Sequence, residues 1–140
     1  MRICIDSCVL INALQGSDPA AIRLLNLIGS GWVLLIPRLI AQEVTRNLQT
    51  PEQVRRFYRL FFEHDVAFIV DDPVPRTLVD KYVHLGLPEK ADAYIGAFAE
   101  WMQARYLVSD NRHFLQNLRT NAFDVLDAGE FMSRWDTDSL

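Results

Sequence analysis

Four acidic side chains in this 140-residue chain have the chemistry to hold a metal ion. Asp6 stands between two apolar runs, Asp110 follows a third apolar run, and Glu43 and Asp92 lie within longer amphipathic stretches. A carboxylate at the edge of buried segments is costly unless it caps a helix, pairs with a cation or holds a ligand. Whether these four acids act together depends on the elements that carry them.

Short apolar runs alternate with longer amphipathic stretches along the whole chain. We expect strands at residues 2–5, 32–36, 66–70, 106–109 and 123–126. We expect helices at residues 7–14, 19–28, 37–48, 51–64, 75–85, 88–104, 112–118 and 128–134. The pattern predicts an α/β fold, a three-layer α/β/α sandwich with a mostly parallel five-stranded sheet, in a single domain spanning residues 1–140.

The expected fold brings the four acids to one edge of the sheet. In an open parallel sheet, ligands bind beyond the carboxyl ends of the strands, near the point where the strand order reverses. Asp6 directly follows the first strand, and Asp110 directly follows the fourth. Glu43 lies two turns into the helix after the second strand. Asp92 lies in the first turn of its helix, on the face expected to meet the sheet.

Each acid also has an ordinary structural role that could explain it. Asp6 could cap the helix that begins at Ser7, which stabilises a helix by about 1 kcal/mol. Asp92 is favoured by the dipole near a helix N-terminus, and Glu43 could pair with Arg46 or Asn47 on the next turn. As a set, however, three or four converging carboxylates repel one another unless a cation compensates. The set therefore predicts a bound divalent cation.

The residue types select the kind of cation. Ligand sets made only of oxygen atoms favour Mg²⁺ or Mn²⁺ over zinc. Cys4 and Cys8 are expected to be small buried side chains without a metal or redox role. The three histidines, His64, His84 and His113, are expected to lie away from the acids, so no histidine general base is predicted.

Four segments of the chain stand out in order: ICIDSCVLINAL from Ile3, PRLIAQEVTRNL from Pro37, KADAYIGAFAEW from Lys90 and YLVSDNRHFL from Tyr106. Together they resemble one family, the PIN-domain nucleases, and in particular the VapC-type toxins of toxin–antitoxin pairs. The resemblance covers nearly the whole chain. It implies a PIN-like fold and an endoribonuclease that uses Mg²⁺ or Mn²⁺ to hydrolyse RNA phosphodiester bonds, leaving 5′-phosphate and 3′-hydroxyl ends.

Carried over to this sequence, the resemblance assigns Asp6, Glu43 and Asp92 as catalytic metal ligands. The fourth ligand is open, because Asn111 stands where the family has an acid and Asp110 is displaced by one position. An amide oxygen can ligate a hard cation but adds no charge. We expect Asn111 to lie near the metal and hold Asp110 as the alternative.

Residues around the acids complete the expected site. Ser7 and Ser109 could orient the first and last acids as hydrogen-bond donors, or simply cap local turns. Arg112 and Arg46 are candidates for contacts with the RNA backbone, which would make binding salt-dependent. The aromatic-rich helix that carries Phe61 and Phe62 could form a subunit interface or an antitoxin groove, or could simply pack into the core.

Composition and charge constrain the function further. A net charge of −4 argues against a protein that coats nucleic acid, although five arginines lie between residues 38 and 59. The longest apolar run is too short to span a bilayer, and the first strand leaves no room for a signal peptide. We therefore expect a cytoplasmic location and no membrane association.

The sequence thus predicts the toxin of a type II toxin–antitoxin pair, with single-stranded or structured RNA as substrate, a cognate antitoxin and a homodimeric assembly. The alternative is a catalytically weak or inactive PIN-like module that binds RNA or protein. A haloacid-type phosphotransferase would need an acid where Cys8 stands, and a receiver domain would need a lysine after Leu126. Both rank below the nuclease.

Overall fold

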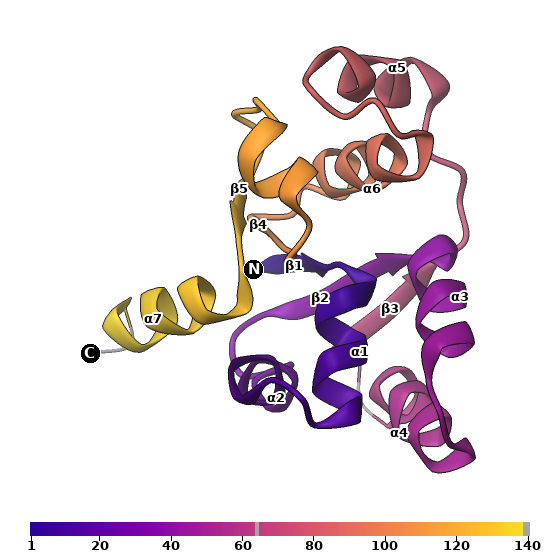
Figure 1. Ribbon diagram of the computed structural model, residues 1–140, viewed down its shortest axis with the longest axis vertical. Helices are drawn as coiled ribbons and strands as arrows, with labels where there is room; N and C mark the ends of the chain where they lie inside the picture. The colour runs from indigo at the N-terminus through magenta and orange to yellow at the C-terminus, as the bar shows by residue number, and fades with distance from the viewer. Residues whose placement is uncertain (64, 139–140) are drawn as a thin grey trace.

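The computed structural model describes residues 1–63 and 65–138. His64, at the expected end of one helix, lies outside the described residues. The strands are β1 (Arg2–Ile5), β2 (Val33–Pro37), β3 (Ala67–Val70), β4 (Tyr106–Val108) and β5 (Asp124–Leu126). The helices are α1 (Ser7–Gln15), α2 (Pro19–Asn26), α3 (Arg38–Asn47), α4 (Pro51–Phe62), α5 (Arg76–His84), α6 (Lys90–Trp101), η1 (His113–Asn117) and α7 (Ala128–Asp138) (Figure 1).

The five strands form one sheet in the order β3-β2-β1-β4-β5, and every pairing is parallel. The predicted α/β fold is therefore confirmed, with a sheet that is entirely parallel. The chain adds β2 and β3 on one side of β1 and then crosses to the other side to add β4 and β5. The strand order reverses at β1, so the carboxyl ends of β1 and β4 flank the point where such sheets bind ligands.

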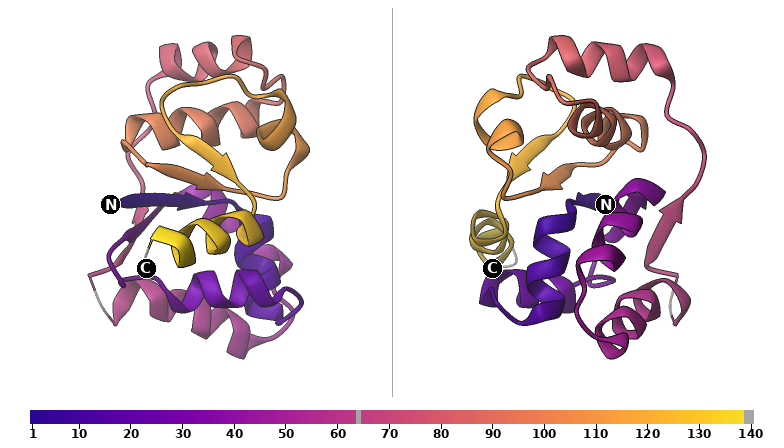
Figure 2. Two further views of the ribbon diagram at one scale, coloured as in Figure 1. Left: turned by 90° about the vertical axis from the view of Figure 1, so that its left-hand side faces the viewer. Right: turned by 45° about the vertical axis from the view of Figure 1, so that its right-hand side comes forward.

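Helices cover both faces of the sheet. Helices α1 to α4 and α7 lie on one face, and α5, α6 and η1 lie on the other (Figures 1 and 2). This division follows from right-handed crossovers, since connections running one way along the sheet use one face and those returning use the other. Both faces of β1 are consequently buried, and Ile3, Cys4 and Ile5 are fully inaccessible. The expected burial of Cys4 is confirmed.

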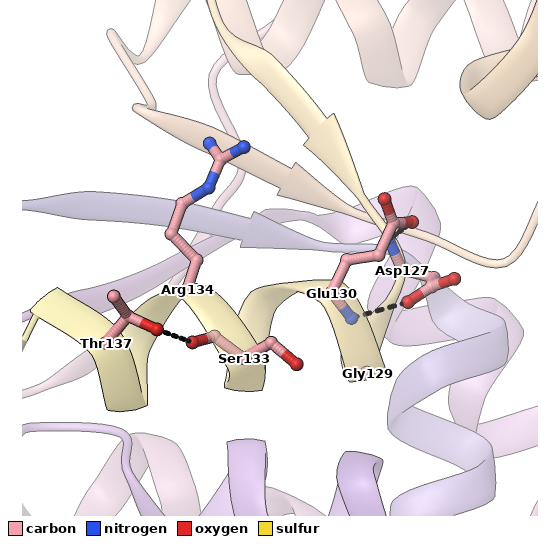
Figure 3. A pocket seen from close by; sticks show the side chains of 6 residues that line it. All are labelled: Asp127, Gly129, Glu130, Ser133, Arg134 and Thr137. Carbon is pink, nitrogen blue, oxygen red and sulfur yellow. Dashed lines mark hydrogen bonds between the residues drawn. The ribbon is translucent and has the colours of Figure 1, made fainter.

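Side-chain caps fix where several helices begin. The Asp6 side chain accepts a hydrogen bond from the Ser7 amide at α1, and Asp18 caps α2, with Pro19 in the first position, as predicted. At α7 the Glu130 amide donates to Asp127 Oδ1 over 2.7 Å, and the Asp127 amide donates to Glu130 Oε1 over 3.2 Å (Figure 3). This reciprocal cap satisfies two amides at the start of the helix.

The segment after β4 differs from the expected α-helix. Residues His113–Asn117 form a π-helix, closed by a hydrogen bond of 3.0 Å from the Leu118 amide to the His113 carbonyl. One extra residue per turn widens this helix, and such turns are frequent at functional sites. Sequence periodicity did not distinguish it, because five residues are too few to separate a period of 3.6 from a longer one.

A close backbone approach anchors the far end of η1. Gly86, between α5 and α6, has φ +114°, and a Cβ atom there would collide with the Asn117 carbonyl group. The Arg119 amide donates to the Leu85 carbonyl over 2.9 Å beside it. The turn that follows β4 is therefore held at both ends, by the sheet and by the α5–α6 connection.

Among the helices that the structure describes, none combines the length and apolar character needed to cross a bilayer.

Candidate active site

The register of β1 against β4 sets the first contact of the site. Ile5 pairs with Val108, so the residues that follow them, Asp6 and Ser109, lie side by side beyond the sheet. The Asp6 amide donates to the Val108 carbonyl over 2.9 Å, and Ser109 Oγ donates to Asp6 Oδ2 over 2.7 Å. Ser109 therefore donates directly to the first acid, as the expected orienting role requires.

A pocket opens at this edge of the sheet. Helix α3 contributes Glu43 to it, the N-terminal turn of α6 contributes Asp92, and the turn after β4 contributes Asp110 and Asn111. The lining residues are Asp6, Ser7, Cys8, Glu43, Ala91, Asp92, Ile95, Asp110 and Asn111. The five residues predicted for the catalytic centre therefore line one pocket.

Asp6 is the most enclosed carboxylate of the pocket, with 5 % of the residue exposed. Its Oδ1 accepts the Ser7 amide over 2.8 Å, and the Cys8 thiol lies 3.9 Å from Oδ2. Asp6 therefore caps α1, as the structural alternative predicted, and it also faces the other acids. The cap occupies only one of its oxygens, so capping does not account for its place in an acidic pocket.

The pKa of Asp6 is raised above its ordinary value, chiefly because burial disfavours the charged form. The hydrogen bonds from Ser109 and Ser7 lower the pKa, whereas the charges of Glu43 and Asp92 raise it further. The Cys8 pKa is raised to about 11, first by burial and then by Asp6. A neutral thiol therefore lies beside a carboxylate that lacks a compensating positive charge among the pocket residues.

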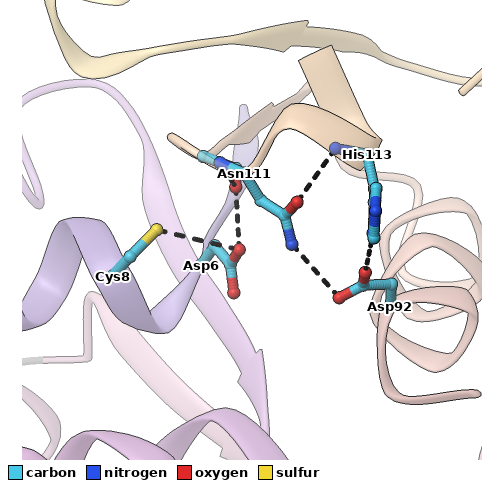
Figure 4. A network of polar contacts seen from close by, with 6 residues as sticks. Asp6, Cys8, Asp92, Asn111 and His113 are labelled. Carbon is cyan, nitrogen blue, oxygen red and sulfur yellow. Dashed lines mark hydrogen bonds and ion pairs between the residues drawn. The ribbon is translucent and has the colours of Figure 1, made fainter. Parts of the chain in front are cut away.

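Asp92 is held by two donors from the turn after β4. His113 Nδ1 lies 2.8 Å from Asp92 Oδ2, and Asn111 Nδ2 donates to Asp92 Oδ1 over 3.3 Å (Figure 4). An ionised carboxylate can only accept hydrogen bonds, so His113 Nδ1 carries the proton in this contact. Both oxygens of Asp92 are therefore oriented before any ligand binds.

The orientation of the Asn111 amide is fixed by its own contacts. Asn111 Oδ1 accepts the His113 amide over 2.9 Å, which leaves Nδ2 directed at Asp92. The Asn111 backbone amide donates to Ser109 Oγ over 3.0 Å. In this arrangement Asn111 presents a donor to the pocket, where an aspartate at the same position would present a second oxygen.

The expectation that His113 lies away from the acids is wrong. The π-helix starts at His113 and turns its ring toward the first turn of α6, where it meets Asp92. The available signal was position, because His113 opens the helix directly after the fourth acid motif. His84 behaves as expected, since its Nδ1 contacts the Asp80 carbonyl within α5.

Asp110, Arg112 and Arg46 are more exposed than Asp6 and Asp92. Asp110 is exposed, and its pKa is raised by desolvation and then by the charges of Asp18 and Asp127. Asp6, by contrast, responds to Glu43 and Asp92. Asp110 thus lines the same pocket but is more exposed than Asp6. Arg112 and Arg46 are exposed and do not belong to the lining residues.

The donor set of the pocket fits a hard divalent cation. Four lining residues carry carboxylates, and none of the lining residues is lysine or arginine. Oxygen donors of this kind suit Mg²⁺ or Mn²⁺. Within residues 1–63 and 65–138, however, no group of three or more His, Cys, Asp or Glu side chains is arranged so that it could hold a metal ion.

Comparison with known proteins identifies the fold. No protein-family model matches the sequence, and no curated protein matches it. A chain in the crystal structure of VapBC2 from Rickettsia felis, bound to a DNA fragment from its promoter, has a TM-score of 0.63 and 15 % identity, covering 91 % of this chain and 98 % of that one. A chain of FitAcB from Neisseria gonorrhoeae has a TM-score of 0.57 and 18 % identity, with the same coverage. The chain therefore shares its fold with these proteins.

Proposed function

We propose that the chain is a Mg²⁺- or Mn²⁺-dependent endoribonuclease that hydrolyses RNA phosphodiester bonds at the pocket of Asp6, Glu43 and Asp92. The observation that carries the proposal is the gathering of these carboxylates at the switch point of a parallel sheet, without a lysine or arginine among the lining residues. Such a pocket attracts a divalent cation and, through it, a phosphate.

The pocket residues and the nearby arginines have separate roles in the proposed reaction. Asp6 is fixed by Ser7 and Ser109, and Asp92 is fixed by Asn111 and His113, so two ligands stand ready from opposite sides of the pocket. Glu43 completes the set from α3. A bound cation supplies a lowered pKa for the attacking water and charge stabilisation at the phosphate. Arg112 and Arg46, both exposed, are proposed to contact the RNA backbone.

We propose that this nuclease is the toxin of a type II toxin–antitoxin pair, acting on RNA in the cytoplasm. Support comes from the fold shared with chains of the VapBC2 and FitAcB complexes, and the acidic pocket favours the nuclease component. The exposed large apolar side chains include two aromatic ones, Phe62 on α4 at 81 % and Phe68 on the edge strand β3 at 40 %. Such exposure suits a protein partner, either the antitoxin or a second copy of the chain.

A second candidate is a PIN-like module that binds RNA or protein without cutting it. The specific observation in its favour is Asn111, whose side-chain nitrogen donates to Asp92 Oδ1, so that Asn111 presents a donor to the acids and not a ligand oxygen. Fewer charged ligands hold a cation less tightly.

Cleavage of labelled single-stranded RNA separates the two candidates. We expect cleavage with Mg²⁺ or Mn²⁺ and none in EDTA, and Asp92→Asn should abolish it because a charged ligand is lost. The matched control is Asp80→Asn, which removes the same charge from an exposed residue of α5 that does not line the pocket and should leave the activity unchanged. RNA binding without cleavage under all metal conditions would favour the binding module. Cleavage that survives Asp92→Asn would contradict the proposed site.

A further inference from the structure

We propose that His113 is a positioning residue for Asp92, and that the affinity of the pocket for a divalent cation depends on the proton donated by His113 Nδ1. This inference rests on the proposed function, because it assigns Asp92 as a metal ligand. It goes beyond that function by assigning His113 a defined role, which is to orient Asp92 through the Nδ1 atom.

The contact is short and joins two separate elements. His113 Nδ1 lies 2.8 Å from Asp92 Oδ2 and connects the start of η1 to the first turn of α6 (Figure 4). The Asp92 side chain is 15 % exposed, whereas the His113 side chain is 39 % exposed. The Asp92 carboxylate is thus mostly enclosed, while the His113 ring lies nearer the surface. This arrangement is expected of a residue that orients a metal-ligating carboxylate from the outer side of the pocket.

The backbone of His113 is fixed before the ring makes its contact. Its amide donates to Asn111 Oδ1, and its carbonyl accepts the Leu118 amide that closes the π-helix. Ring rotation is therefore the main freedom left to the side chain. Because Asn111 Nδ2 holds Oδ1 of the same carboxylate, His113 and Asn111 together prevent Asp92 from rotating.

A carboxylate held in this way meets a cation without losing further side-chain freedom. Hydrogen bonds to ligating carboxylates typically change metal affinity by about 10- to 100-fold when they are removed. We infer an effect in this range for His113, acting through Asp92 and without direct contact with the cation.

Two nearly isosteric variants isolate the proton donor. In His113→Asn the amide nitrogen stands at the δ position, where Nδ1 stood, and can donate to Asp92. In His113→Leu a methyl group takes that place and cannot donate. Both replace a partly exposed ring, so both proteins should stay folded in EDTA, and the leucine protein should unfold at a slightly lower temperature because Asp92 Oδ2 loses its donor. His113→Ala gives a second variant without the donor if the leucine protein does not fold.

Binding of Mn²⁺ alone, measured by titration calorimetry on the full chain, tests the inference without relying on activity. We expect His113→Leu to weaken binding at least about tenfold and His113→Asn to stay within about threefold of the unchanged protein. Asp92→Asn, made in the otherwise unchanged protein, should abolish Mn²⁺ binding.

The possible failures are distinguishable. If the unchanged protein binds Mn²⁺ and Asp92→Asn abolishes binding, but His113→Leu binds normally, the role of His113 is refuted and the proposed function stands. Equal weakening in the leucine and asparagine proteins would also refute it, since the donor would then be irrelevant. An unchanged protein that binds no Mn²⁺ would overturn the metal site and the role of His113 together.

Discussion

Asp6→Asn is expected to lower metal-dependent RNA cleavage at least about 1,000-fold, because a bound cation contributes several kcal/mol of transition-state stabilisation. Asp6 directly follows β1, the central strand of the sheet, and it receives hydrogen bonds from both Ser7 and Ser109. Asparagine has nearly the same shape as aspartate but carries no charge. The measurement is the initial rate of cleavage of a labelled RNA with saturating Mg²⁺.

The same substitution should leave the fold intact. The asparagine oxygen can still accept the Ser7 amide, so the cap of α1 survives. Burial raises the pKa of Asp6, which means that the charged form is disfavoured in the folded protein. The unfolding temperature of the metal-free variant near pH 7 should therefore not fall below that of the unchanged protein. A variant that cleaves normally, or one that unfolds, would contradict this account of Asp6.

Asn111→Asp is expected to have two opposite effects. It removes the donor that holds Asp92 Oδ1 and places a carboxylate there, so the metal-free protein should lose about 1 to 3 kcal/mol of unfolding free energy. With Mn²⁺ present the added charge becomes a ligand, and binding should tighten at least about tenfold, since ligand charge sets affinity for hard cations. Thermal unfolding with and without Mn²⁺, together with calorimetry, measures both effects.

A matched control for this substitution is Asn121→Asp. Asn121 is exposed in the connection between η1 and β5, away from the pocket lining, and the variant carries the same net charge. Its Mn²⁺ affinity should stay that of the unchanged protein. If Asn111→Asp also left both stability and Mn²⁺ affinity unchanged, position 111 would not belong to the metal site.

The fold was predictable because its determinants are local. The apolar run at Ile3–Ile5, the cap-and-proline pair Asp18-Pro19 and the alternation of strands with helices all predicted the elements that the structure contains. Element ends were less accurate. The helix after Asp18 ends at Asn26 instead of residue 28, and the last helix extends to Asp138 instead of residue 134. The ends depend on packing between elements, which the periodicity of a single segment does not encode.

The candidate site was predictable to the level of which residues meet. Parallel strands place the residues after Ile5 and Val108 together, so the meeting of Asp6 with the turn after β4 follows from topology. The contact between His113 and Asp92 does not follow from topology. It depends on how the turn from Ser109 to His113 lies against the first turn of α6, which the periodicity of either segment does not encode. The direction of the Asn111 amide likewise depends on its contact with the His113 backbone.

We propose that a divalent cation held by Asp6, Glu43 and Asp92 drives hydrolysis of RNA by water. The most direct test is the identity of the product ends after digestion of single-stranded RNA with Mg²⁺, with a parallel digestion in EDTA. Attack by water predicts 5′-phosphate and 3′-hydroxyl ends, formed only with the metal. Products ending in a 2′,3′-cyclic phosphate, or equal cleavage in EDTA, would contradict it.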